Sequence, residues 1–352
     1  MKVPKLLVVA SAVDLDFRYG CTPAWWQLWK GFAQAGVDLI VTPYRGRAIE
    51  SPWWRTAPNP CYREGEAFAA ARAALARLKG DVARAFIDGS PACASGYYHG
   101  VLERGFTGVE DSELDDKARE LCADPQLAAA PFLQFQCYHG LGHGLMIYTA
   151  YDMPLGLKTC DALQDAFGQT SCAGGVFMEN SNTSYGRQSE YLKDDDLIYP
   201  CNDVAERHKY ACYQLVTARI RLVKPGWKEI AAECRKSEPE WEATCFESMG
   251  RDVSGDAGRD TRKALKMCRA AGPDEIECDY GVAREIVNAD SGGERAARFC
   301  NQVPRENRGR CFEGVGTVLT TLHTTNADKR RACAEIAGRY ARDCQTGAGV
   351  PG

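Results

Sequence analysis

The cysteines of this chain recur at a nearly constant interval. Fourteen of the seventeen fall into pairs, and the last five pairs begin 33, 34, 32 and 33 residues apart. Each of those five pairs leaves nine or ten residues between its members. A period near 33 residues is typical of one helical hairpin in a repeat array. The pattern predicts one disulfide per hairpin, in this order: Cys122–Cys137, Cys160–Cys172, Cys201–Cys212, Cys234–Cys245, Cys268–Cys278, Cys300–Cys311 and Cys333–Cys344.

The spacing within each pair favours disulfides over zinc. Structural zinc sites usually bring two cysteines within a few residues of each other, whereas the paired cysteines here are at least ten positions apart. Disulfides persist in oxidising compartments. We therefore expect the repeat region to work in the periplasm or outside the cell.

The charge and hydropathy of the chain argue against two classes of partner. The net charge is −4, which gives no basis for binding nucleic acid or an anionic membrane surface. No run of about 18 apolar residues is present, so no transmembrane segment is expected. Near the N-terminus the apolar stretch Leu6–Val13 is short for a secretory signal. We interpret it as a buried strand, with a signal peptide as the alternative.

Residues 80–352 have the apolar spacing of helices, as in Trp227–Arg235 and Asp328–Arg342, with breakers such as Pro225-Gly226 between them. We predict that the first cysteine of each pair lies late in one helix and the second early in the next. The disulfide then closes the turn. The expected fold is mainly α, a right-handed α-solenoid of about seven disulfide-linked hairpins.

A small residue usually stands three positions after the second cysteine of a pair. Glycine inside a helix costs about 1 kcal/mol relative to alanine, so its repeated use at one place needs a reason. We expect two helices to approach there too closely for a larger side chain. The residues at this position, with the matching one after Cys93, are Gly96, Gly140, Gly175, Ser248, Gly281 and Gly314.

Residues 1–79 read differently, as strand, helix, strand and helix. Lys5–Ala12 and Val37–Tyr44 have the composition of buried parallel strands. Thr22-Pro23 starts a helix over Ala24–Ala35, which Gly36 ends, and a second helix is expected over Arg63–Leu78. The chain thus divides into a small α/β segment, 1–79, and a cysteine-rich helical domain, 80–352.

Two resemblances follow from these segments. The stretches LLVVASAVDLDFRYG, TPAWWQLWKGFAQAG and VDLIVTPYRGR resemble the opening βαβ unit of a glycosyltransferase with two Rossmann domains (GT-B type). This implies a partial Rossmann-like segment and a transferase-related protein. In such enzymes a second Rossmann domain holds the nucleotide-sugar, and nothing after residue 80 resembles one. The helical domain resembles Sel1-like repeats in architecture, although those have closer cysteines and a longer period.

Histidines gather in the first two repeats. His99 and His143 both stand six residues after a cysteine, so adjacent hairpins would place them on one surface. His139 and Glu103 lie four residues from them, on the same helix faces. Glu179 stands at the edge of this group in the next repeat. Imidazoles with a carboxylate suit Zn²⁺ or another first-row transition metal, and open coordination would let the metal activate a water.

Two other readings of the histidines stay open. They could fill tight helix contacts and bond to neighbouring carbonyls, or they could form an acid–base or ligand site without metal. The sequence predicts first a binding or scaffold module for a protein or peptide ligand, because repeat arrays offer long concave faces. A metal-dependent enzyme that uses His99, His139 and His143 is the second hypothesis. A glycosyltransferase-related protein is the third.

Overall fold

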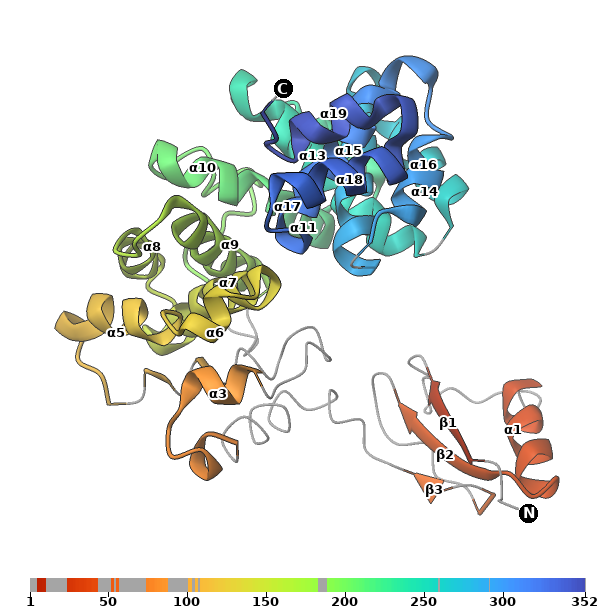
Figure 1. Ribbon diagram of the computed structural model, residues 1–352, viewed down its shortest axis with the longest axis horizontal. Coiled ribbons are helices and arrows are strands. Elements are labelled where there is room, and N and C mark those ends of the chain that lie inside the picture. The colour runs from red at the N-terminus through yellow and green to blue at the C-terminus, as the bar shows by residue number, and fades with distance from the viewer. Residues whose placement is uncertain are drawn as a thin grey trace. The chain divides into compact units, whose positions relative to one another are not determined.

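The computed structural model describes residues 5–10, 24–43, 52–53, 55–56, 74–87, 101–102, 105–106, 108–182, 189–258, 260–290 and 292–351 (Figure 1). The chain forms two compact units, Met1–Val101 and Leu102–Gly352. The predicted domain boundary between residues 79 and 80 stays a prediction.

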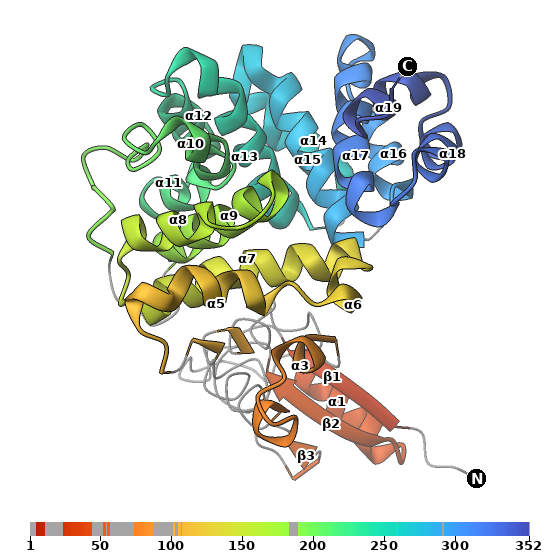
Figure 2. The same cartoon turned by 60° about the vertical axis from the view of Figure 1, so that its left-hand side comes forward.

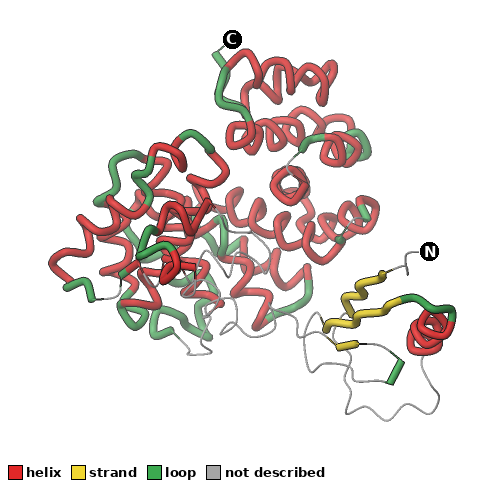
Figure 3. Tube along the Cα trace, turned by 60° about the horizontal axis from the view of Figure 1, so that its bottom comes forward, coloured by secondary structure: helices red, strands yellow, loops and turns green. Residues whose placement is uncertain are grey.

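The first unit contains all the strands of the described chain (Figure 3). Strand β1 (Lys5–Ala10) pairs in parallel with β2 (Asp38–Pro43), and α1 (Ala24–Gln34) connects them. The short β3 (Arg55–Thr56) extends the sheet beside β2, where the Arg55 guanidinium binds both carboxylate oxygens of Asp38. Helix α3 (Val82–Ile87) follows. Of the helix expected over Arg63–Leu78, the part before residue 74 lies outside the described residues, and residues 74–77 are helical.

The second unit is a series of helical hairpins, so the protein is mainly α as predicted. We number the hairpins 1 to 7 by their disulfides and call their two halves the first and second arms. The first-arm helices are α5 (Leu114–Leu121), α8 (Met153–Asp161), α12 (Trp227–Cys234), α14 (Thr261–Cys268), α16 (Glu294–Cys300) and α18 (Asn326–Ala337). The second-arm helices are α7 (Pro131–Tyr148), α9 (Ala166–Asn182), α10 (Glu206–Tyr213) with α11 (Val216–Val223), α13 (Pro239–Ala257), α15 (Glu275–Asp290), α17 (Arg308–Leu322) and α19 (Ala341–Gly347).

Short helical turns complete the connections: α6 (Pro125–Ala128), η1 (Asp111–Glu113), η2 (Arg269–Asp274), η3 (Arg305–Asn307) and η4 (Gly338–Tyr340). Among the helices that the structure describes, none combines the length and the apolar character needed to cross a bilayer.

All seven predicted disulfides are confirmed, each within one hairpin. Their Cα–Cα distances lie between 5.3 and 5.9 Å. The fourteen disulfide-bonded cysteines are all buried, and Cys212 is the most exposed of them at 3%. The first cysteine stands at or near the end of a first-arm helix in most hairpins, and the second lies four or seven residues into the second-arm helix. The hairpins are therefore closed covalently, as the cysteine period predicts.

Local sequence signals set the helix ends. The side chains of Asp152 and Asp260 accept hydrogen bonds from the first backbone N–H groups of α8 and α14. Prolines occupy the first turn of α7, α8 and α13, where the missing N–H costs nothing. Helices α13 and α18 stop at Gly258 and Gly338, whose φ angles of 61° and 53° suit glycine. The second of these breaks the helix that the sequence predicts over Asp328–Arg342.

Hairpin 3 departs from the pattern. Its first arm contains no helix between residues 189 and 205, where the chain forms turns around a cis Tyr199–Pro200 bond. Its second arm is broken between α10 and α11 at Gln214 and Leu215. The third period of the sequence thus keeps its disulfide while losing the regular first helix.

Consecutive second-arm helices pack on each other, as Figure 2 shows for α13, α15 and α17. A Cβ atom built on Gly250 would lie 2.1 Å from the carbonyl oxygen of Cys278, and one on Gly281 would lie 2.0 Å from that of Glu247. The two helices therefore touch backbone to backbone. The same contact joins α7 to α9 through Gly142 and Gly175.

A third crossing of this kind joins α17 to α19 through Gly316 and Gly347. In each crossing one helix supplies the glycine five residues after its cysteine, and the next helix supplies the one three residues after. The close approach expected at position three is confirmed at Gly175 and Gly281. Ser248 fills the same position in hairpin 4, where its hydroxyl bonds to Thr217 at 2.7 Å.

Helix α13 supplies a matched pair of glycines for testing this contact. Gly250→Ala places a methyl group against the backbone of α15, so we expect it to lower the free energy of unfolding by about 2 kcal/mol or more. Gly255 lies in the same helix, is exposed, and a Cβ atom added to it would have no neighbouring atom within 4 Å. Gly255→Ala should be neutral or stabilise by up to about 1 kcal/mol. Chemical unfolding of both variants measures this, and equal effects would contradict the backbone contact.

Candidate functional site

The crossing of α7 and α9 brings together a buried histidine and a buried glutamate. His143 follows Gly142 directly, and Glu179 lies one turn beyond Gly175. His143 Nδ1 and Glu179 Oε2 are 2.8 Å apart, and the two side chains are 4% and 2% exposed. A carboxylate on Nδ1 fixes the proton on that nitrogen, so Nε2 carries the lone pair of the neutral ring.

Tyr151 completes this group from the end of α7. Its hydroxyl donates to the other oxygen of Glu179, Oε1, at 2.7 Å. The Tyr151 N–H bonds to the Met146 carbonyl and the Ala150 N–H to the Ile147 carbonyl, which is the Schellman arrangement that usually places glycine after the helix end.

In this protein Ala150 and Tyr151 both have positive φ, 54° and 72°. A residue with a side chain pays about 1 kcal/mol or more in that region. The strained turn is the backbone conformation that carries the Tyr151 hydroxyl to Glu179. Strained backbone conformations are common at functional sites, so the group of His143, Glu179 and Tyr151 is a candidate functional site.

His139 lies one turn before His143 on the same helix. The centroids of the two rings are 5.1 Å apart, and Phe135 stacks on the other side of His139 at 5.5 Å. The ring also lies beside α9, since a Cβ on Gly174 would stand 3.4 Å from His139 Nδ1, at ordinary contact distance. Burial, together with the charges of His143 and Arg251, lowers the pKa of His139 to about 3. The imidazole is therefore neutral at physiological pH, the form that binds metals.

The structure brings together three of the five predicted metal ligands: His139, His143 and Glu179. His99 and Glu103 lie outside the described residues. Among the residues that are described, no group of three or more His, Cys, Asp and Glu side chains is arranged to hold a metal ion. The predicted metal site therefore depends on what residues 99 and 103 add. Sequence reasoning considered Tyr151 only as one of several tyrosines of an aromatic wall or core, because the backbone turn that brings it to Glu179 has no clear sequence signal.

An equivalent pair elsewhere supports a structural reading of His143 and Glu179. These residues stand six and seven positions after the cysteines of consecutive hairpins. The same positions in hairpins 4 and 5 hold Arg251 and Glu285. Burial raises the pKa of Glu285 and the charge of Arg251 opposes that rise, so the two groups interact. Arg251 donates its hydrogen bond to Asp252, at 2.8 Å, and acts on Glu285 through its charge.

A larger polar network links hairpins 3 to 6. Arg284 donates to Gln214 at 2.7 Å, and Arg310 donates to Glu247 at 3.0 Å and to Glu277 at 2.7 Å. Burial raises the pKa of Glu247, although both arginines act against it. Each partner comes from a different second-arm helix or its neighbour, so this network joins hairpins rather than forming a separate site.

Asp279 is a buried carboxylate of another kind. It is fully buried, and neither of its oxygens has a hydrogen-bond partner among the described residues. It stands one position after Cys278, where hairpins 4 and 6 place Phe246 and Phe312 in the core. Burial, with a smaller contribution from Glu275, raises the pKa of Asp279 to about 8. The group is therefore mostly protonated at neutral pH.

A pocket of about 320 Å³ opens beside the irregular hairpin 3. Helix α8 forms one side and residues 199–208 the other. Apolar and aromatic side chains make up most of its lining, including Met153, Leu157, Tyr191 and Tyr199. Its size falls at the lower end of the range for small-molecule sites. Sequence reasoning did not find this pocket, because it exists only where a helix is missing.

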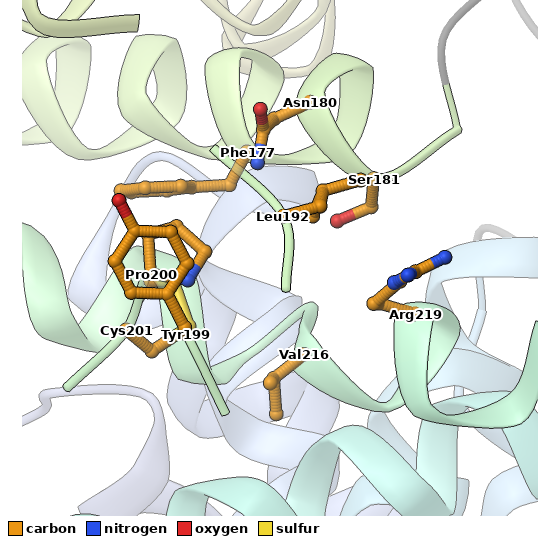
Figure 4. A pocket seen from close by; sticks show the side chains of 10 residues that line it. Phe177, Asn180, Ser181, Leu192, Tyr199, Pro200, Cys201, Val216 and Arg219 are labelled. Carbon is orange, nitrogen blue, oxygen red and sulfur yellow. A yellow bond between two sulfur atoms is a disulfide. The ribbon is translucent and has the colours of Figure 1, made fainter. Parts of the chain in front are cut away.

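A second, much smaller cavity borders the same segment (Figure 4). Its volume of about 10 Å³ is close to that needed by one water molecule. Tyr199 and Pro200 line both cavities, and Cys201 and Cys212 line the small one. The wall of the larger pocket is therefore anchored by the disulfide of hairpin 3.

Comparison of the chain with protein-family models, with curated proteins and with solved structures finds no match. The resemblances to GT-B glycosyltransferases and to Sel1-like repeats thus rest on the residues that suggest them.

The ionisation of Asp279 gives a stability that depends on pH. Its pKa is higher in the folded chain than the ordinary value of 3.8, so the folded state holds the proton more tightly and loses stability as pH rises from about 4 to 8. Asp279→Asn keeps the shape without the charge. We expect the stability of the variant relative to the native chain to rise by about 4 kcal/mol between pH 5 and pH 8, because only the native chain loses stability over that range. A difference that does not change with pH would show that the carboxylate is not buried as described.

Proposed function

We propose that this protein is a binding or scaffold module that works in the periplasm or outside the cell, and that it takes its ligand in the pocket beside hairpin 3. The observation that carries the proposal is the pocket itself. The pocket lies beside the irregular hairpin and is large enough for a small ligand. Its lining is mostly apolar, with a few charged side chains.

The seven disulfides suggest an oxidising compartment. Each closes a short loop and restricts the unfolded chain, which favours the folded state without a large central core. Outside the cytosol, cytosolic chaperones cannot refold a protein that has unfolded. A disulfide in every hairpin, which disfavours unfolding, is therefore consistent with that location. The location in the periplasm or outside the cell remains part of the proposal.

The histidine group favours a second candidate function, a metal site. Metal-binding histidines commonly donate their other ring N–H to a carboxylate, as His143 does to Glu179. The low pKa of His139 would spare a metal from competition with protons. The proposed metal site also includes His99 and Glu103, which are assigned to it only by their positions in the sequence repeat. With an open coordination position the metal would support hydrolysis or redox chemistry.

A neutral apolar dye tests the pocket without presuming the charge of its ligand. Nile red should bind the full chain at one site with a rise in fluorescence. Val204, which is half-buried, lines the pocket, and Val204→Trp should remove that binding by occupying the space. Val223→Trp is the matched control, because Val223 is exposed on α11 and does not line the pocket. Binding that survives Val204→Trp, or no binding by the native chain, would contradict the proposal.

Metal analysis of the oxidised protein tests the second candidate. After incubation with Zn²⁺ and gel filtration, we expect one zinc per chain, which His143→Ala should abolish because it removes the ligand that Glu179 orients. His323→Ala is the control, since His323 follows α17 outside the histidine group. A native chain that retains no zinc would rule out the site.

A further inference from the structure

The charged groups around the pocket point to the kind of ligand it takes. Asp161 on α8 lies in the lining, where His208 Nε2 approaches its Oδ1 at 2.8 Å and Arg207 Nε donates to its Oδ2 at 2.8 Å. Burial alone would raise the pKa of Asp161, but the bonds and charges of Arg207 and His208 outweigh it and lower the pKa. The charge of Asp161 is therefore already balanced within the protein.

Two cationic groups remain for a ligand. Lys158 lines the pocket, is exposed, and has no hydrogen bond or ion pair to any described residue. Arg207 uses Nε and Nη2 for Asp161, so the Nη1 N–H groups can serve another acceptor, and its side chain is 66% exposed. Opposing charges are also present among the described residues: Asp203 in the lining is exposed, and Asp152 and Glu190 act on Tyr191.

The rest of the lining selects a flat apolar body. Met153 and Leu157 stand four residues apart on one face of α8 and are each 5% exposed. Tyr191 and Tyr199 add two aromatic rings from the segment that replaces the first-arm helix. Aromatic rings and a methionine sulfur both favour contact with another aromatic ring.

We infer that the pocket binds an aromatic carboxylate, with the ring among Met153, Leu157 and the two tyrosines and the carboxylate at Lys158 and Arg207. This inference rests on the proposed binding function and specifies the ligand of the same pocket. A free aromatic acid and the C-terminal aromatic residue of a peptide share this chemistry.

Isothermal titration calorimetry with defined probes tests the inference on the full chain. Phenylacetate should bind about tenfold more tightly than the neutral phenylacetamide, because a charge-assisted hydrogen bond is lost in the amide. The preference should weaken at high salt, since the cations are exposed. An acetylated alanyl-phenylalanine with a free C-terminus, compared with its amide, distinguishes a peptide from a free acid as the source. Preference for either carboxylate over its amide supports the inference.

A pair of lysine variants tests whether Lys158 binds the carboxylate of the ligand. Lys158→Met should weaken phenylacetate binding about tenfold and leave phenylacetamide unchanged. Lys228→Met is the control, because Lys228 is exposed on α12 away from the pocket. Asp203→Asn should strengthen phenylacetate binding or leave it as it is.

The possible failures are distinguishable from one another. If Nile red binds at the pocket but phenylacetate and phenylacetamide bind equally, the inference is wrong and the binding function stands. Tighter binding of phenethylamine than of phenylacetate would also overturn the inference. If Nile red itself does not bind, the pocket is not a binding site and both proposals fall.

Discussion

The contact on which the helical unit depends is the one between the backbones of neighbouring second-arm helices. At three crossings a glycine from each helix lets the partner's carbonyl oxygen approach to a position that any side chain would occupy. Because the two backbones touch, these helices cannot come closer, and a larger side chain at either glycine would push them apart. The disulfides close each hairpin within itself, whereas the glycine crossings set the contact between hairpins 1 and 2, 4 and 5, and 6 and 7. Stability within repeats and order between them thus come from different chemistry.

The histidine group is a consequence of one such crossing. Because Gly142 meets Gly175, the side chains just beyond them, His143 and Glu179, are held within hydrogen-bonding distance in the core. The equivalent positions at the α13–α15 crossing hold Arg251 and Glu285, where the charge of Arg251 opposes the rise that burial causes in the pKa of Glu285. What sets the first pair apart is the strained turn that adds Tyr151. That turn has no counterpart among the other described second-arm helices, where positive φ is confined to glycine.

The pocket has the opposite origin, because it lies where the repeat is broken. In hairpin 3 the first arm is a chain of turns, and the face of α8 that carries Met153 and Leu157 borders a cavity of about 320 Å³. The disulfide between Cys201 and Cys212 keeps the irregular arm in place. Among the hairpins that the structure describes, this irregular one borders the pocket to which we assign the proposed ligand.

The sequence by itself determined the helical class, the hairpin period, the seven disulfides and the need for glycine at the crossings. These follow from regular spacing, and regular spacing is visible in one dimension because neighbouring hairpins repeat the same local contacts. Only the tertiary structure decided which glycines meet, that Tyr151 reaches Glu179, that Asp279 is buried without a partner, and that a pocket opens beside α8. The last three depend on departures from the repeat. All four depend on contacts between residues far apart in the chain, which packing sets and no local pattern encodes.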